Sequence, residues 1–259
     1  MVIAVTTDRA NPRGGFRSAG SAVLWKAWQE SRGRFFSALG LLASVVMYAV
    51  ITRPEHVTGR PYIHSAYIWG GLFHYALQGL WVLAALVLTL GGLRREKAMG
   101  VAPFTLGLPV ARLRMFLIRA TLACAEAVAL ALLPALLIPI ISPFVGESYP
   151  FGQALAFGAL MSAAGLVVVA IGLLLSEMFE GEFTAPVVGL CGLTTIFLSY
   201  KAQMLHGWNV FDVMSGTSYV DRTTRLLNGT TPWSDLTICL LVSFGLVFIA
   251  GVTIRTRDL

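Results

Sequence analysis

The sequence predicts an all-α polytopic membrane protein with six transmembrane helices, and three observations support this fold class. Of the 259 residues, 56% are hydrophobic and only 12% are charged, whereas soluble domains carry about 25% charged residues. The mean hydropathy is +0.75. The apolar residues also gather in long runs separated by short polar stretches, as in proteins that cross a bilayer repeatedly. We therefore expect a single membrane-embedded domain over residues 1–259.

The chain begins with a polar stretch and an amphipathic segment. Residues 1–20 contain spaced arginines and lack the apolar core of a secretory signal peptide. In residues 21–34, Trp25 and Trp28 accompany apolar residues while charged side chains share another face, as in helices that lie in the membrane interface. The same pattern also fits the solvated end of the first span. We expect residues 1–34 to form a cytoplasmic tail and an interfacial helix.

Residues 35–254 are expected to hold six spans, each long enough to cross a bilayer with its flanks. Pro134 and Pro139 fall within the third span and predict a kink in its outer half. Residues 201–234 form the longest polar segment but carry large apolar side chains, which predicts short helices on the membrane surface. Residues 255–259 form a tail. The expected spans are Phe35–Ile51, Ala66–Gly92, Met115–Ile141, Gln153–Leu175, Phe183–Tyr200 and Asp235–Ile254.

The distribution of basic residues predicts the orientation. With six spans both termini lie on the same side, and fourteen of the nineteen Lys and Arg residues fall on that side. Because basic residues concentrate in cytoplasmic segments, both termini are predicted to lie in the cytoplasm. These residues flank apolar runs instead of forming one patch. The net charge of +6 therefore favours membrane lipid over nucleic acid as a partner.

The most strongly charged segment between two apolar runs is Leu93–Arg114. Each Arg or Lys at the bilayer centre costs roughly 2.5–3.5 kcal/mol on insertion scales, so this segment is predicted to be a cytoplasmic loop. It contains a small amphipathic unit with Val101, Phe104 and Leu108 on one side. A compact, partly apolar loop of this kind is suited to docking against another protein.

This loop, and the order of the elements around it, resemble the permeases of ABC-2 type transporters. In that family the segment between spans two and three reads as a Glu, a Gly-Thr-like step and a Leu-Pro-Val-Ser-Arg-like ending. Val101 stands here in place of the usual Thr, and Ala111 in place of the usual Ser. The resemblance in layout covers nearly the whole chain, while the motif is confined to this segment. The matching residues are Glu96, Gly100, Leu108, Pro109, Val110 and Arg112.

The resemblance implies a transport subunit of an exporter that is not itself an enzyme. The matching residues would form a coupling helix seated in a groove of a separate ABC ATPase, and the interfacial helix would contact the same partner. A second permease subunit, identical or paralogous, would complete the translocation path, with spans two and five lining it. The ATPase would bind ATP and Mg, because this chain has no G-x-x-x-x-G-K-[ST] motif. The expected location is the bacterial plasma or inner membrane.

Two ionisable residues fall inside the third span. Arg119 and Glu126 are seven residues apart and share one helical face. Arg119 lies near the cytoplasmic end and can extend toward the headgroups. Glu126 lies deeper, where a carboxyl group is either functional or locks helix packing through a hydrogen bond, with Gln78 or another polar group as its partner. The sequence leaves both roles open.

Other chemistry has less support. The three cysteines show no C-x-x-C spacing, and the four histidines form no H-E-x-x-H motif, so we expect no metal site. Two alternative functions remain. One is a membrane enzyme or assembly factor that uses polar groups such as Glu126. The other is a proton-coupled secondary carrier, which would require more intramembrane carboxylates and internal repeats.

Overall fold

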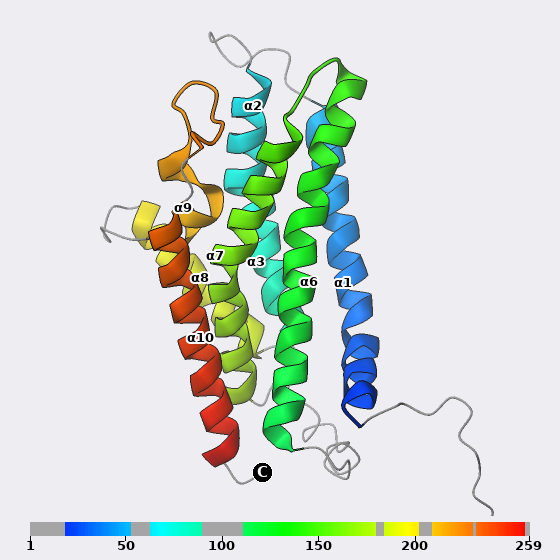
Figure 1. Ribbon diagram of the computed structural model, residues 1–259, viewed down its shortest axis with the longest axis vertical. Coiled ribbons are helices and arrows are strands. Elements are labelled where there is room, and N and C mark those ends of the chain that lie inside the picture. The colour runs from blue at the N-terminus through cyan, green and yellow to red at the C-terminus, as the bar shows by residue number, and fades with distance from the viewer. Residues whose placement is uncertain are drawn as a thin grey trace, which may run out of the picture.

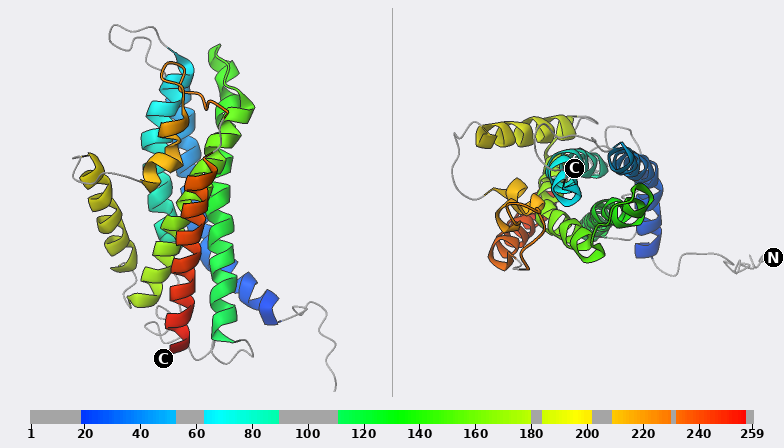
Figure 2. Two further views of the ribbon diagram at one scale, coloured as in Figure 1. Left: turned by 60° about the vertical axis from the view of Figure 1, so that its left-hand side comes forward. Right: turned by 90° about the horizontal axis from the view of Figure 1, so that it is seen from above.

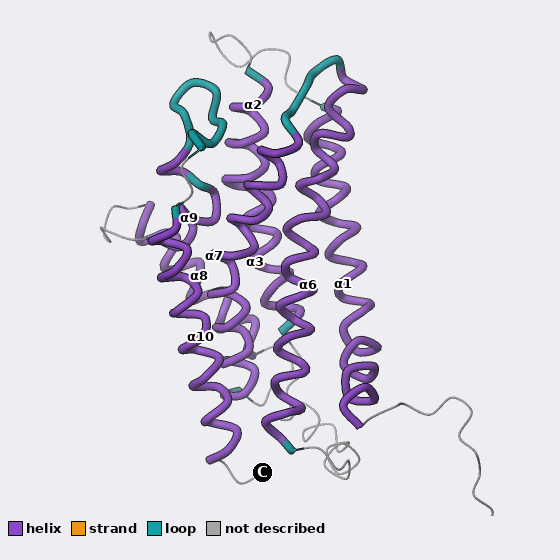
Figure 3. The backbone as a smooth tube through the Cα atoms, in the orientation of Figure 1, coloured by secondary structure: helices purple, strands orange, loops and turns teal. Residues whose placement is uncertain are grey.

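The computed structural model describes residues 19–52, 63–89, 111–179, 184–201, 209–229 and 232–256. These residues form an elongated bundle of helices (Figure 1). They contain no β-strand, only one isolated bridge between Val220 and Leu227. Most of the described loops lie at the ends of the helices (Figure 3). The predicted all-α class is therefore confirmed for the described part of the chain.

The helices follow the predicted spans to within a few residues at each end, except that the helix of the first span begins at Ala19 and not at Phe35. The second span differs in type, because its first half is a π-helix. The third span continues as one helix through Pro134 and Pro139. In chain order the elements are α1 (Ala19–Ile51), α2 (His64–Tyr67), the π-helix η1 (Ile68–Ala76), α3 (Leu77–Leu88), α6 (Arg112–Ile141), the 3-10 helix η2 (Ser142–Val145), α7 (Phe151–Met178), α8 (Thr184–Lys201), α9 (Val210–Ser215), the 3-10 helix η3 (Thr217–Tyr219) and α10 (Trp233–Thr256).

Within the described residues, five helical stretches are long and apolar enough to cross a membrane. Large apolar side chains on their outer faces are exposed; on α10, for example, Phe244 is 73% exposed. Such faces are expected where a helix contacts lipid, because exposing an apolar surface of this length to water is unfavourable. The predicted fifth span falls on α8, whose apolar part, Val187–Ser199, is shorter than the other five. The architecture is that of an all-α membrane protein, and six spans stay a prediction.

The predicted interfacial helix and first span form one continuous helix, α1. Figure 2 shows that the first turns of α1 lean away from the bundle while the remainder packs along it. Trp25 is exposed, whereas Trp28 packs against Phe35 with ring centroids 5.9 Å apart. No proline or glycine pair interrupts this stretch, so the backbone stays helical through the predicted boundary.

Helix α7 lies at the centre of the bundle and packs against α3, α6, α8, α9 and α10. Three of its glycines, Gly158, Gly165 and Gly172, recur every seven residues and therefore share one face. A Cβ atom at Gly158 would lie 3.2 Å from Ala135 of α6, and one at Gly165 would lie 2.3 Å from Trp81 of α3. The missing side chains let α3 and α6 approach α7 closely, as small residues do in membrane bundles.

Residues 209–229 lie at one side of the bundle, toward the end away from the C-terminus (Figure 1). The fold of this segment depends on Asp221, whose carboxylate accepts hydrogen bonds from the amides of Thr223 and Thr224, both at 2.8 Å. Arg225 follows in the left-handed region, with φ of 56°, and its guanidinium lies 4.7 Å from the centre of the Trp69 ring. The turn at Asp221 therefore places a cation on a buried aromatic side chain of η1.

This turn should open on acidification. Hydrogen bonds from the amides of Thr224 and Thr223 lower the pKa of Asp221 below its usual value. A lowered pKa stabilises the fold above the unfolded-state value, and this contribution is lost as the pH falls through the folded-state pKa. Amide hydrogen exchange at Thr223 and Thr224 should accelerate roughly five- to tenfold in Asp221→Ala at neutral pH. Relative to the intrinsic exchange rate at each pH, protection of these amides should fall on acidification in the parent chain but not in the variant, and equal protection in both proteins would contradict the assignment.

Candidate functional site

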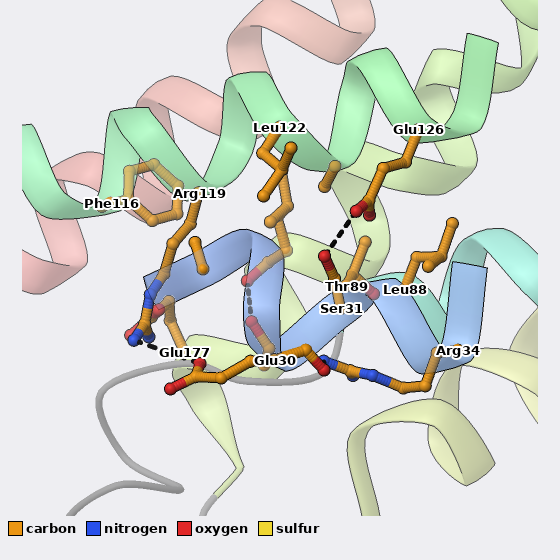
Figure 4. Close-up of a pocket in the computed structure, with 14 residues that line it drawn as sticks. Glu30, Ser31, Arg34, Leu88, Thr89, Phe116, Arg119, Leu122, Glu126 and Glu177 are labelled. Atoms are coloured by element: carbon orange, nitrogen blue, oxygen red, sulfur yellow. Dashed lines mark hydrogen bonds and ion pairs between the residues drawn. The ribbon is translucent and has the colours of Figure 1, made fainter. Parts of the chain in front are cut away.

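A cluster of charged and hydroxyl side chains lies between α1, α3, α6 and α7, near the end of the bundle where α10 terminates (Figures 1 and 4). The surrounding helix faces are apolar, so these groups are concentrated at one place in the described bundle. Glu30, Ser31 and Arg34 belong to α1, Arg119 and Glu126 to α6, Ser176 and Glu177 to α7, and Thr89 directly follows α3. We refer to these eight residues as the polar cluster.

Glu126 is the deepest charged residue of the polar cluster and is only 4% exposed. The hydroxyl of Ser31 donates a short hydrogen bond to its Oε1 atom. Its Oε2 atom is buried without a hydrogen-bond partner. Of the two expected kinds of partner, Gln78 or another polar group, the structure has the second, since Gln78 instead donates to the carbonyl of Phe211 at 2.6 Å. Figure 4 shows the Glu126 side chain directed at Ser31 across the interface between α6 and α1.

Arg119 makes the second contact between these two helices. Its guanidinium lies 3.8 Å from the carboxylate of Glu30, and the Arg119 side chain is 15% exposed. Lys26 also lies 3.8 Å from Glu30, one helical turn away on α1. The predicted pair of Arg119 and Glu126 on one helical face therefore meets two consecutive residues of α1, Glu30 and Ser31. Two contacts at successive positions hold α1 against α6.

Arg34 joins α1 to the end of α3. Its guanidinium donates to the carbonyl of Val87 at 3.0 Å and to the carbonyl of Glu30 at 3.3 Å. Val87 lies in the last turn of α3, where carbonyl groups have no partner within the helix and carry the negative end of the helix dipole. A cation is stabilised there. Arg34 thus adds a second donor to the Val87 carbonyl, which also accepts from a backbone N–H at the cap of α3.

The hydroxyl groups of Thr89 and Ser176 complete the polar cluster. Thr89 donates to the carbonyl of Leu86 at 2.7 Å, and Ser176 donates to that of Leu173 at 2.8 Å. Each hydroxyl has therefore used its single proton and offers only lone pairs to the cluster. Thr89 fits because residue 172 of α7 is glycine, where a Cβ atom would lie 2.3 Å from its Oγ1 atom.

The structure describes only one of the six predicted coupling residues. Glu96, Gly100, Leu108, Pro109 and Val110 lie outside the described residues. Arg112 is the first residue of α6 and is exposed.

Sequence reasoning identified Arg119 and Glu126 but missed their partners on α1. It assigned residues 21–34 to the membrane interface, and a polar residue such as Ser31 gives no sign that it will be buried. Charge spacing offered one signal, since Lys26, Glu30 and Arg34 recur every four residues and so share a face. That face proved to be the one directed at α3 and α6.

A second, mostly apolar cavity of about 300 Å³ lies between η1, α3, α8 and α9. Its polar groups are His74, Gln78 and Thr194, and its aromatic walls include Phe197 and Phe211, whose ring centroids are 5.4 Å apart. Cavities of this size accommodate small organic ligands. It lies between the helices that correspond to the predicted second and fifth spans.

Within the described ranges, no group of three or more His, Cys, Asp or Glu residues is arranged to hold a metal ion. A search of protein-family models and of curated proteins finds no match to this chain. Its function must therefore be inferred from the chemistry and the positions of its own residues.

Proposed function

We propose that the chain is the membrane-spanning permease subunit of an ABC-2 type exporter. It would form part of the translocation path and couple that path to ATP hydrolysis by a separate ATPase subunit, which binds ATP and Mg. A second permease subunit, identical or paralogous, would complete the path. Both termini would lie in the cytoplasm of a bacterial cell, with the bundle in the plasma membrane.

The observation that carries the proposal is the connection between the ends of α3 and α6. Residues 90–110 link these two helices, leaving α3 after Thr89 and entering α6 through Ala111. The polar cluster joins both helices to α1. Arg34 of α1 contacts α3, and Glu30 and Ser31 of α1 contact α6. A force applied to this link by a partner would therefore move α1, α3 and α6 together. Packed helices transmit such displacements because their interfaces do not deform continuously.

The apolar cavity supports a role in translocation. Gln78 anchors α9 to α3 through the Phe211 carbonyl, while Leu193 and Phe197 of α8 form the opposite wall. Helix α8 packs on α7 and α3 along one side only, and Val187 on its other side is 55% exposed. A helix held on one side can shift relative to the bundle at a lower free-energy cost than the central α7. This arrangement suits a wall that opens and closes.

The test is purification of the tagged chain from native membranes in mild detergent. A nucleotide-binding subunit should co-elute in fixed stoichiometry, and its ATP hydrolysis should be stimulated when both proteins are reconstituted together in lipid. The partner without this chain serves as the control. If the purified chain moves substrate across vesicles without a hydrolase, or the two proteins do not affect each other's activity, the proposal fails.

A further inference from the structure

We propose that the polar cluster is a binding site for a small monovalent cation, with Glu126 as its central ligand. This inference does not depend on the energy source of transport. It rests on the chemistry of the groups that line one cavity between α1, α3, α6 and α7.

The first argument is an unsatisfied carboxylate oxygen. Glu126 is 4% exposed, and its Oε2 atom has no hydrogen-bond partner although Oε1 accepts from Ser31. Buried polar atoms in native proteins are nearly always paired, because an unpaired one incurs the full desolvation penalty. Glu126 is one of the residues that line a cavity of about 40 Å³. A cavity needs roughly 10–15 Å³ to hold one water, so this one accommodates a cation with about one or two waters.

The second argument is that the neighbouring hydroxyl groups act only as acceptors. Ser31 gives its proton to Glu126, Thr89 gives its proton to Leu86, and Ser176 gives its proton to Leu173. These hydroxyl oxygens therefore have only lone pairs left for a ligand. Figure 4 shows Ser31 and Thr89 near the Glu126 carboxylate. Oxygen lone pairs beside a carboxylate suit a hard cation and do not suit an anion or an apolar group.

The third argument is charge. Glu30, Glu126 and Glu177 line the cavity with Arg34 and Arg119, and Lys26 lies 3.8 Å from Glu30 beside it. The guanidinium of Arg34 is engaged by the carbonyls of Val87 and Glu30, and that of Arg119 by the carboxylate of Glu30. Lys26 and Arg119 are thus paired with Glu30 and Arg34 with two carbonyls, so the Glu126 carboxylate is the one that an added positive charge would balance.

The same features favour a monovalent over a divalent ion. Calcium sites use six to eight oxygens with several carboxylates, and magnesium requires octahedral geometry. The described residues contain no group of three acidic, His or Cys side chains arranged for such an ion. A site made of one carboxylate oxygen, hydroxyl oxygens and one or two waters instead suits sodium or potassium, whose single charge requires fewer anionic ligands. The ion can enter past Glu30, whose side chain is 40% exposed at the rim.

The experiment measures the thermal stability of the full chain in lipid nanodiscs as choline chloride is replaced by sodium or potassium chloride at constant ionic strength. A ligand that binds only the folded state raises the melting temperature. Between 1 and 200 mM of the preferred cation we expect an increase on the order of 3–6 °C. Glu126→Gln should lose this increase, and Thr89→Val should need about tenfold more cation to reach it.

Thr121→Val is the matched control. Thr121 lies on the exposed side of α6 and donates to the carbonyl of Ile118 at 2.9 Å, the same local bond that Thr89 makes, but it does not line the cavity. This variant should respond to the cation like the parent chain. Equal melting temperatures in choline and in both alkali salts would overturn the proposal. So would an undiminished response in Glu126→Gln or, if that variant does not fold, in Thr89→Val.

Discussion

Gly165→Ala is expected to destabilise the bundle by about 3 kcal/mol, because the new methyl group would occupy the position of a ring that cannot move away. The Cβ atom would lie 2.3 Å from Cη2 of Trp81. Trp81 is fully buried, and its Nε1 atom donates to the carbonyl of Ala127 at 2.9 Å. Withdrawal of the ring would break this bond and leave a buried donor unpaired, which adds to the steric cost.

The measurement is unfolding of the purified chain in mixed micelles with increasing denaturing detergent. Gly152→Ala is the control in the same helix, since nothing lies within 4 Å of a Cβ atom at that position. It should leave stability unchanged or slightly increased. Trp81→Phe should largely rescue Gly165→Ala, because phenylalanine lacks the outer ring atoms that meet the methyl group. If Gly165→Ala is as stable as Gly152→Ala, the close contact between α3 and α7 is wrong.

Replacement of Leu108–Val110 by Gly-Ser-Gly should abolish coupling to the ATPase while leaving the bundle inserted in the membrane. The stimulation of ATP hydrolysis by the reconstituted complex should fall at least tenfold, which corresponds to about 1.4 kcal/mol of lost interaction. The reason is mechanical. A glycine-rich link cannot pass a displacement to α6, whose first residue, Arg112, follows within two positions.

The matched control is the same replacement at Pro143–Val145, a triplet that also contains proline but lies in η2 at the other end of α6. Phe144 there is 85% exposed and Val145 is only partly buried against the core, so the change should leave the coupling intact. Membrane insertion is checked by carbonate extraction of both variants. If the Leu108–Val110 variant retains full stimulation, this segment does not transmit the ATPase cycle.

The span boundaries could be predicted because they depend on local composition. A run of apolar residues must remain in hydrocarbon, and a helix satisfies every backbone group along that run without help from distant residues. The predicted third span, Met115–Ile141, and α6 therefore end at the same residue. The interfacial helix was placed less well, because the sequence shows its amphipathic face but not where the backbone bends.

The candidate site was only partly predictable. Glu126 was identifiable as an ionisable residue inside an apolar run, since such residues are rare in membrane spans. Its partner could not be found, because Ser31 is 95 positions away and has no distinguishing pattern around it. The π-helix at Ile68–Ala76 was also not foreseen, as its backbone bonds leave no signature in the apolar periodicity.

The sequence by itself determined the fold class, the helix limits and the presence of a charged segment between α3 and α6, because each depends on the solvent that a stretch of chain prefers. Only the tertiary structure decided which helix faces meet. The glycines of α7 set how closely α3 and α6 approach α7, and the packing of α1 on α6 brings Glu30 and Ser31 to Arg119 and Glu126. Contacts between distant segments follow from shape complementarity, which composition and periodicity do not encode.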